Sequence, residues 1–375
     1  MNESRWGEWA ACQADRIQSA GQWRAPRDFD GRGPTGILTA TGQTVVQFAS
    51  NDYLGLTAHP AVAAAARDAI DRWGTGAGAA RLIVGSRPIH TDLEHALATW
   101  KRSESAVLFP TGFAANLGVI GAFGTPETLI CSDELNHASI IDGTRLAGAE
   151  VQIYPHNDLT ALDAILRGHA RGRRSLIVTD TVFSMDGDTA DLDGLLALRA
   201  EHDALLVLDE AHAVLGPEFD RLPEESVLRV GTLSKTLGSL GGFVAGPRSL
   251  CDLVVNRARS YIFTTAPTPA DSAAALAALA VVQSAEGDDL RARLRANIDQ
   301  LREGHPSPII PIVCGSEARA LEATAALLER GILVPAIRPP TVAPGTSRLR
   351  VALSAAHTLD QVRELRAALA GLGLG

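Results

Sequence analysis

Between about residues 51 and 265 of the 375-residue chain, short apolar runs alternate with stretches of helical periodicity. The apolar runs are 106–109, 128–131, 151–154, 175–179, 204–208, 227–232 and 242–245. Strands that are almost continuously apolar are buried on both faces, which is typical of a parallel sheet covered by helices. This alternation therefore predicts an α/β fold with a mostly parallel central sheet.

The pattern changes on both sides of this region, which predicts three parts of the chain. Residues 1–50 are predicted to form an N-terminal arm with one short strand at 44–48. Residues 51–265 form the predicted large domain. Residues 266–375 are predicted to form a smaller α+β domain. Its predicted elements are a long helix from Asp271 to about Arg302, strands at 309–313 and 348–353, and helices near 317–330 and from about Asp360.

The composition is that of an ordinary globular protein, with 46% hydrophobic and 21% charged residues. The formal net charge is −9, so the chain has no general attraction to nucleic acid or to anionic lipid. The N-terminus lacks the apolar core of a signal peptide, and no apolar run approaches the length of a membrane span. We therefore expect a cytoplasmic protein without nucleic-acid or membrane partners. The four cysteines are far apart in the sequence and predict neither a zinc site nor a disulfide framework.

Lysine occurs only at Lys101 and Lys235, although the chain has 34 basic residues. Lys235 follows a strand-like run and stands among small and hydroxyl residues, in GTLSKTLG (231–238). A Schiff-base lysine needs an amine that can lose its proton, which arginine cannot provide. This favours Lys235 as a chemical group, with the hydroxyls of Thr232 and Ser234 placed to bind a phosphate. Lys101 ends a predicted helix and is typical of a solvated helix-end cation.

The apolar run 205–208 ends in Asp209 and Glu210, and His212 follows. A carboxylate at the C-terminal end of a parallel strand lies where α/β sheets bind ligands. Two classes of protein have a DEAH segment at the end of such a strand. One is the nucleotide-driven helicases. The other is the enzymes that use pyridoxal 5′-phosphate (PLP), in which the aspartate pairs with the pyridinium nitrogen of the cofactor. The helicase also needs a GxxxxGK[ST] phosphate loop. Neither lysine follows a glycine, so the helicase class is excluded.

Other polar residues are ambiguous when each is taken alone. Gly112 and Phe113 begin a predicted helix after a strand, where free amides bind phosphate, although most such turns only reverse the chain. A single histidine such as His137 is more often structural than functional. Arg348 and Arg350 alternate along a predicted strand, so they share a face that either binds a carboxylate or is solvated. No histidine spacing matches a standard metal motif, and we expect no metal.

Taken together, these segments resemble the α-oxoamine synthases, PLP enzymes with the aspartate aminotransferase fold. The resemblance covers about residues 44–357, nearly the whole chain. Each motif is weak alone, and their shared order along the chain makes the resemblance specific. The motifs are SNDYLGL (50–56), TGF (111–113), NHASIIDG (136–143), VFSMDGD (182–188), DEAH (209–212), GTLSK (231–235), IRPPTV (337–342) with GTSRLR (345–350), and SAAH (354–357).

The resemblance implies a role for each matching residue. Lys235 is expected to bind PLP covalently, His137 to stack on its ring, Asp209 to pair with the ring nitrogen, and His212 to reach the phenolic oxygen. Further cofactor contacts, chiefly to the phosphate, are expected from Gly112, Phe113, Ser184 and Thr232. The expected substrate contacts are Arg24, Asn51, His137, Thr341 and Arg350, of which Arg350 binds the amino-acid carboxylate.

The resemblance also implies a reaction, the decarboxylative condensation of an amino acid with an acyl thioester. The motifs are nearest to those of the members that join L-alanine to a pimeloyl thioester in biotin biosynthesis, with CoA or an acyl carrier protein as the acyl carrier. The alternative is a sister synthase that joins glycine to another acyl-CoA, such as 2-amino-3-ketobutyrate CoA ligase or 5-aminolevulinate synthase. The family further implies a homodimer.

Overall fold

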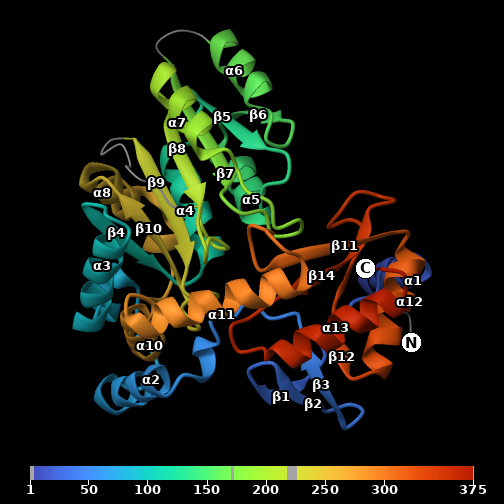
Figure 1. The fold of residues 1–375 in the computed structure, drawn as a ribbon. Coiled ribbons are helices and arrows are strands. Elements are labelled where there is room, and N and C mark those ends of the chain that lie inside the picture. The colour runs from blue at the N-terminus through green and yellow to red at the C-terminus, as the bar shows by residue number, and fades with distance from the viewer. Residues whose placement is uncertain (1–3, 170–172, 218–225, 375) are drawn as a thin grey trace.

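A seven-stranded sheet forms the centre of the computed structural model, which describes residues 4–169, 173–217 and 226–374 (Figure 1). The strand order is β4-β10-β9-β8-β7-β5-β6. Neighbouring strands from β6 to β9 are parallel, and β10 is antiparallel to both β9 and β4, so the predicted mostly parallel sheet is confirmed. The strands are β4 (Ser105–Phe109), β5 (Thr128–Asp133), β6 (Glu150–Tyr154), β7 (Arg174–Asp180), β8 (Leu205–Asp209), β9 (Val227–Thr232) and β10 (Gly242–Gly246).

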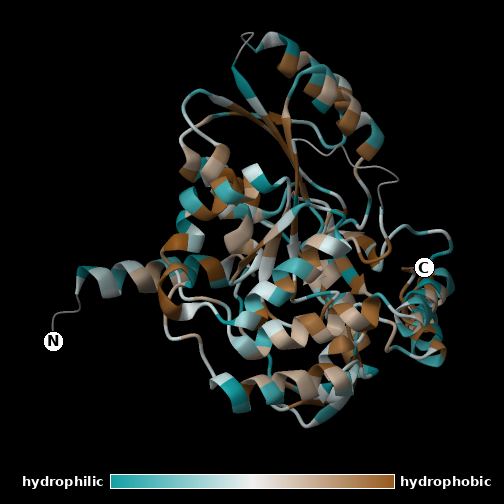
Figure 2. Cartoon of the chain, turned by 90° about the vertical axis from the view of Figure 1, so that its left-hand side faces the viewer, coloured by the Kyte–Doolittle hydropathy of each residue, from teal (hydrophilic) through white to brown (hydrophobic). Residues whose placement is uncertain are grey.

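Helices cover both faces of this sheet, which is why its strands are apolar on both faces (Figures 1 and 2). All residues of β5 and β10 are buried. Among the described residues, no helix is both long and apolar enough to cross a membrane. The helical elements of this region are η1 (Leu56–Ala58), α2 (Pro60–Trp73), η2 (Arg81–Gly85), α3 (Pro88–Trp100), α4 (Gly112–Phe123), α5 (Ala138–Ala147), α6 (Leu159–Gly168), α7 (Leu192–Glu201), α8 (Arg248–Arg257) and α9 (Arg259–Ile262).

The N-terminal residues form more structure than the single strand predicted for them. Helix α1 (Arg5–Ser19) has no buried residue and extends beyond the rest of the molecule (Figure 2). It is followed by β1 (Phe29–Arg32), β2 (Thr35–Leu38) and β3 (Gln43–Gln47). β3 pairs in parallel with β12 (Ile332–Leu333), so a strand of the predicted arm is joined to the C-terminal part of the chain.

The C-terminal part combines helices with a small antiparallel sheet of order β11-β14-β13. One expectation is wrong: the predicted helix from Asp271 to about Arg302 is two helices, α10 and α11. α10 ends where the amide of Gln283 bonds to the carbonyl of Leu279, and Gly287 allows α11 to begin against it, since a Cβ there would lie 2.3 Å from the carbonyl oxygen of Val282. The elements are α10 (Pro269–Val282), α11 (Ala285–Leu301), β11 (Ile309–Gly315), α12 (Glu317–Glu329), β13 (Ala336–Ile337), β14 (Ser347–Ala352) and α13 (Leu359–Gly371).

The loop at residues 182–189 contacts the C-terminal part of the chain. The hydroxyl of Ser307 donates to the carbonyl of Gly187 at 2.7 Å. Gly187 has φ +71°, and a Cβ there would lie 2.0 Å from the carbonyl oxygen of Ile309, so this close approach requires glycine. Arg348 of β14 forms an ion pair with Asp186 of the same loop. These contacts fix the position of β14, which carries Arg350, relative to the central sheet.

His156 holds the other side of this loop. Its Nδ1 lies 3.0 Å from Oδ1 of Asp133 at the end of β5, and its Nε2 lies 2.7 Å from Oδ2 of Asp188 in the loop. Burial lowers the pKa of His156, but the hydrogen bonds and charges of Asp188 and Asp133 outweigh burial, so the pKa is raised. Each ring nitrogen of His156 thus faces a carboxylate, and the raised pKa favours the protonated imidazole, which has an N–H for each of them.

We predict that His156→Gln destabilises the protein at low pH and has less effect at high pH. A histidine whose pKa is raised on folding contributes stability that is complete below its unfolded pKa and is lost as the pH rises through its folded pKa. Thermal unfolding at pH 5.5 and pH 9 measures this, with the exposed His95→Gln variant as control. A difference in Tm that is equal at both pH values would contradict the charged link.

Candidate active site

The C-terminal ends of β7, β8 and β9 and the N-terminus of α4 enclose a cavity of about 180 Å³. Parallel strands place the residues that follow them at one edge of the sheet, where ligands of α/β proteins bind. Seven of its lining residues were predicted as cofactor or catalytic groups: Gly112, Phe113, His137, Asp209, His212, Thr232 and Lys235. The structure therefore brings these segments, which are far apart in the sequence, to one place.

Asp209 is the last residue of β8, and it is buried. Its Oδ2 accepts a hydrogen bond of 2.7 Å from Nδ2 of Asn116, and its Oδ1 accepts one of 2.9 Å from the amide of Ala211. Hydrogen bonds from two sides fix the orientation of the carboxylate, and each oxygen keeps a second lone pair. Asp209 can therefore accept a further N–H donor from a group in the cavity.

A second carboxylate, Asp180, lies beside Asp209 because β7 and β8 pair these two residues in register. Burial and the charge of Asp209 raise the pKa of Asp180 well above its ordinary value. Its Oδ2 accepts the backbone N–H of His137 at 2.8 Å. Asp180 thus holds the His137 segment, while the carboxylate of Asp209 faces the cavity.

His137 begins helix α5 and is oriented by neighbours on two sides. Its Nδ1 accepts a hydrogen bond from the hydroxyl of Ser139 at 2.7 Å, and that hydroxyl accepts from Nδ2 of Asn116 at 2.9 Å. Asn116 therefore connects His137 to Asp209. Burial and the nearby Lys235 lower the pKa of His137, although Asp209 opposes them, so the imidazole is neutral and suited to stack on an aromatic ring.

Lys235 lies in the tight turn between β9 and β10 and points its Nζ into the cavity. Gly238 in this turn has φ +57°, and a Cβ there would lie 2.6 Å from the amide nitrogen of Thr57, so the turn requires glycine. Burial lowers the pKa of Lys235, and the charges of Asp209 and Asp180 only partly offset this. The lowered pKa favours the neutral, nucleophilic amine.

A chain of hydrogen bonds runs from Lys235 to β14. Nζ of Lys235 lies 2.9 Å from Nε2 of His212, whose Nδ1 lies 2.6 Å from the hydroxyl of Tyr53. That hydroxyl is 3.1 Å from Oδ1 of Asn51, and this Oδ1 accepts a hydrogen bond from Nη2 of Arg350 at 3.1 Å. Burial, with the charges of Lys235, Arg350 and His137, holds the pKa of His212 well below its ordinary value.

Helix α4 directs its N-terminus at the opposite end of the cavity. The side chain of Thr111 accepts from the amide of Ala114, whereas the amides of Gly112 and Phe113 have no hydrogen-bond partner among the described residues. Free amides at a helix N-terminus bind phosphate. Gly242 permits this arrangement, because a Cβ there would lie 2.5 Å from the amide nitrogen of Gly112. The hydroxyls of Thr232 and Ser234 lie at the same end.

These groups match the functional groups of PLP one by one. Asp209 can bind a pyridinium N–H, Lys235 can bind an aldehyde carbon, and the free amides of α4 can bind a phosphate. His212 lies next to Lys235, where it reaches a phenolic oxygen beside the aldehyde, and neutral His137 is suited to cover a ring face. The residues present therefore fit the cofactor.

A profile of the aminotransferase class I and II family matches residues 43–369. The 8-amino-7-oxononanoate synthase of Anaeromyxobacter dehalogenans is 47% identical over 382 residues, which cover 97% of this chain and 95% of the relative. The 8-amino-7-oxononanoate synthase of Geobacter sulfurreducens is 42% identical, with 97% of each chain covered. The chain belongs to the 8-amino-7-oxononanoate synthase family.

Solved structures share this fold over most or all of the chain. Serine palmitoyltransferase from S. paucimobilis with bound PLP has a TM-score of 0.90 and 26% identity, and all of both chains is covered. The 8-amino-7-oxononanoate synthase of Francisella tularensis has a TM-score of 0.72 and 27% identity, with 87% of this chain and 97% of that chain covered. These likenesses confirm the fold predicted from the sequence, that of the PLP-dependent transferases.

The other predicted site residues of this member of the 8-amino-7-oxononanoate synthase family do not line the cavity. Ser184 joins the network through its carbonyl, which accepts from Nε of Arg350 at 2.5 Å. Arg24 and Thr341 are exposed and do not line the cavity, so the structure does not bring them to the other predicted residues.

Four residues of the site were given no role from the sequence: Tyr53, Asn116, Ser139 and Asp180. Only Asp180 had a sequence signal, because an acidic residue ends the apolar run 175–179 just as Asp209 ends the next one. The others act through contacts between distant segments.

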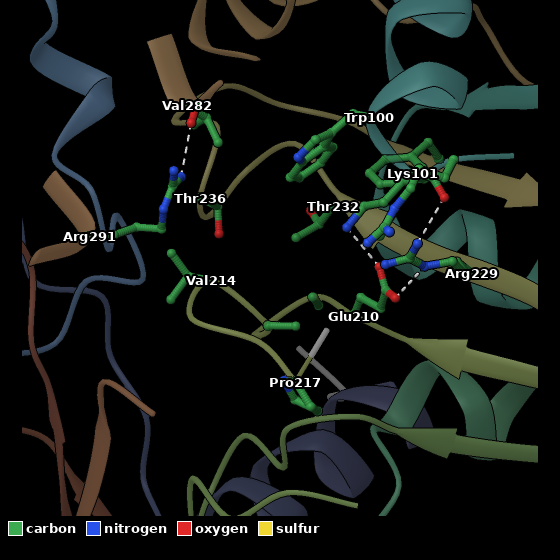
Figure 3. Close-up of a pocket in the computed structure, with 15 residues that line it drawn as sticks. Trp100, Lys101, Glu210, Val214, Pro217, Arg229, Thr232, Thr236, Val282 and Arg291 are labelled. Carbon is green, nitrogen blue, oxygen red and sulfur yellow. Dashed lines mark hydrogen bonds and ion pairs between the residues drawn. The ribbon is translucent and has the colours of Figure 1, made fainter. Parts of the chain in front are cut away.

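A second cavity of about 250 Å³ lies behind Thr232, and Figure 3 shows its lining residues. Here the expectation of a solvated Lys101 is wrong, because Lys101 is buried. Its Nζ lies 2.8 Å from Oε2 of Glu210, and Nε of Arg229 lies 2.5 Å from Oε1 of Glu210 (Figure 3). Lys101 also lies over the ring of Trp100 at 3.9 Å. The buried carboxylate of Glu210 thus draws the lysine inward and ties the helix end to β9.

We predict that Glu210→Gln lowers the free energy of unfolding by about 3 kcal/mol, because removing one partner leaves buried cations without their counter-charge. Urea unfolding measures this, and the exposed Glu322→Gln variant on α12 is the matched control. A loss no larger than that of the control would show that the buried ion pairs contribute little.

Proposed function

We propose that the protein is an 8-amino-7-oxononanoate synthase. It condenses L-alanine with a pimeloyl thioester and releases 8-amino-7-oxononanoate, CO₂ and the free thiol. One observation carries this proposal: one cavity contains the nucleophilic amine of Lys235 and the carboxylate of Asp209, and a chain of polar contacts leads from Lys235 to the buried cation Arg350. The curated relatives with this name support the choice of substrates.

The proposed cofactor is PLP, for which this cavity supplies a binding group at each end. Asp209 binds its ring nitrogen, the free amides of Gly112 and Phe113 with Thr232 bind its phosphate, and Nζ of Lys235 binds its aldehyde carbon. When bound, PLP supplies a protonated ring that withdraws electrons from the bonds to the amino-acid Cα. A serine palmitoyltransferase of the same fold contains PLP, which supports this assignment.

Arg350 is proposed to bind the amino-acid carboxylate. It is buried on β14 and donates to two neutral acceptors, the carbonyl of Ser184 and Oδ1 of Asn51. Its neighbour Arg348 has an acidic partner, Asp186, whereas in the described part of the chain Arg350 has no ion pair. A buried cation without a counter-charge favours an anionic ligand, and a bound carboxylate would provide the missing charge.

Lys235 is proposed to serve twice, first as the covalent anchor and then as the base. Once the amino acid has taken its place on the cofactor, Nζ of Lys235 is free to accept the proton from Cα. A base for this step needs a pKa near the working pH, and burial moves the pKa of Lys235 in that direction. Neutral His137 covers the reacting face and excludes water from it.

The proposal includes a homodimer in which a second copy covers an apolar surface close to the cavity. Leu82, Ile83 and Val84 lie exposed on η2, which contacts α9, and exposed Phe263 follows α9, while Leu240 is half exposed and lines the cavity. Exposed apolar groups gathered in this way are typical of interfaces. The acyl carrier is either CoA or an acyl carrier protein, and the sister synthases that use glycine with another acyl-CoA are the alternative function.

We predict that the purified protein, supplied with PLP, releases CO₂ from L-alanine in the presence of pimeloyl-CoA or pimeloyl carrier protein. Release of labelled CO₂ and mass spectrometry of the product measure this. Glycine and serine, each offered with pimeloyl, acetyl, succinyl and palmitoyl thioesters, serve as the comparison. A higher kcat/KM for one of these pairs would replace the proposed function with that of a sister synthase.

We predict that borohydride attaches PLP to Lys235 alone. Borohydride makes the bond between the amine and PLP permanent, and the chain offers just one other lysine, Lys101, as an internal control. Peptide mass mapping should find the adduct at Lys235 in the wild-type protein and no adduct in Lys235→Ala. An adduct at Lys101, or an unchanged adduct mass in Lys235→Ala, would contradict the assignment of the anchor.

A further inference from the structure

His212 touches two groups that bear on its protons, Lys235 on the cavity side and Tyr53 on the other. Tyr53 is fully buried in the core, and its hydroxyl lies 2.6 Å from Nδ1 of His212. The opposite ring nitrogen, Nε2, lies 2.9 Å from Nζ of Lys235. The hydrogen-bonding role of His212 in the cavity therefore depends on which ring nitrogen carries a proton.

Only a few protons are available to the contact between His212 and Tyr53. Burial and the surrounding cations keep the pKa of His212 well below its ordinary value, so the imidazole is neutral and carries one N–H. Burial raises the pKa of Tyr53 to about 12, so its hydroxyl keeps its proton. The contact between Nδ1 and the hydroxyl contains a single proton, which belongs either to the histidine or to the tyrosine.

The length of this contact favours the tyrosine as donor. Hydrogen bonds that an N–H donates to an oxygen are about 2.7–3.2 Å long, and hydroxyl donors make shorter ones. The observed 2.6 Å is below the range for an N–H donor. The other acceptor near the Tyr53 hydroxyl, Oδ1 of Asn51, is more distant at 3.1 Å and already accepts a hydrogen bond from Arg350.

We propose that Tyr53 is a positioning residue that holds His212 in the form protonated at Nε2. Its hydroxyl donates to Nδ1, which leaves Nε2–H to donate into the cavity. In the protein without cofactor the acceptor is the lone pair of the Lys235 amine, so the lysine is kept neutral and ready to react. With PLP bound, the same N–H donates to the phenolic oxygen, and this second part rests on the proposed function.

Nitrogen NMR of the full chain with ¹⁵N-labelled histidine tests the proposal directly. In the wild-type protein without PLP, Nδ1 of His212 should show the shift of an unprotonated nitrogen and Nε2 that of a protonated one. The His212→Asn variant assigns the signals by their loss. A protonated Nδ1 in the wild-type protein overturns the proposal, and this result needs no further variant.

Tyr53→Phe removes the donor and keeps the buried ring. The Nε2–H form should then give way to a mixture or to the Nδ1–H form. Tyr154→Phe is the matched control, because Tyr154 is also buried and its hydroxyl bonds to Thr179 away from the cavity. It should leave the His212 signals unchanged. The same tautomer in Tyr53→Phe as in the wild type would contradict a positioning role for Tyr53.

Titration with PLP separates this inference from the proposed function. Loss of one hydrogen bond to a charged oxygen should raise the dissociation constant of PLP roughly tenfold in Tyr53→Phe, together with a shift of the cofactor absorbance band. An unchanged constant and band would remove the second part of the proposal. If the wild-type protein fails to bind PLP while Nε2 is protonated, the proposed function fails and the role of Tyr53 stands.

Discussion

The register of the parallel strands β7 and β8 determines the geometry of the whole site. It places Asp180 beside Asp209, and a shift of one strand by a single residue would turn its carboxylate to the other face of the sheet, away from its neighbour. The next strand, β9, leads into the turn that carries Lys235, so the amine meets the same edge. Backbone hydrogen bonds deep in an apolar sheet thus set the distances between groups that react at its rim.

Placing so many charged and titratable groups in one buried region is costly unless each has a partner. In this structure, neutral side chains bridge the charged ones and so reduce the free-energy cost of burying them. Asn116 connects Asp209 to Ser139 and so to His137, and Tyr53 lies between His212 and Asn51. These bridges hold the reactive groups in fixed orientations before any ligand binds, which is the preorganisation that electrostatic catalysis requires.

The central sheet was largely predictable from the sequence, because strands buried on both faces leave continuous apolar runs that end in polar residues. The rarity of lysine singled out Lys235, and the acidic end of β8 singled out Asp209. The break between α10 and α11 was not predictable, because a close approach at Gly287 decides it. Local pattern also could not show that Lys101 turns inward, since its partner Glu210 is more than a hundred positions away in the chain.

The short strand β12 has a consequence for how the chain is made. It supplies the parallel partner of β3, and the amide of Phe48 bonds to the carbonyl of Leu333. On the ribosome, the three N-terminal strands β1, β2 and β3 therefore emerge long before the strand that completes their sheet. Its open edge must stay unpaired through most of translation, which exposes it to pairing with other nascent chains until the last segment is released.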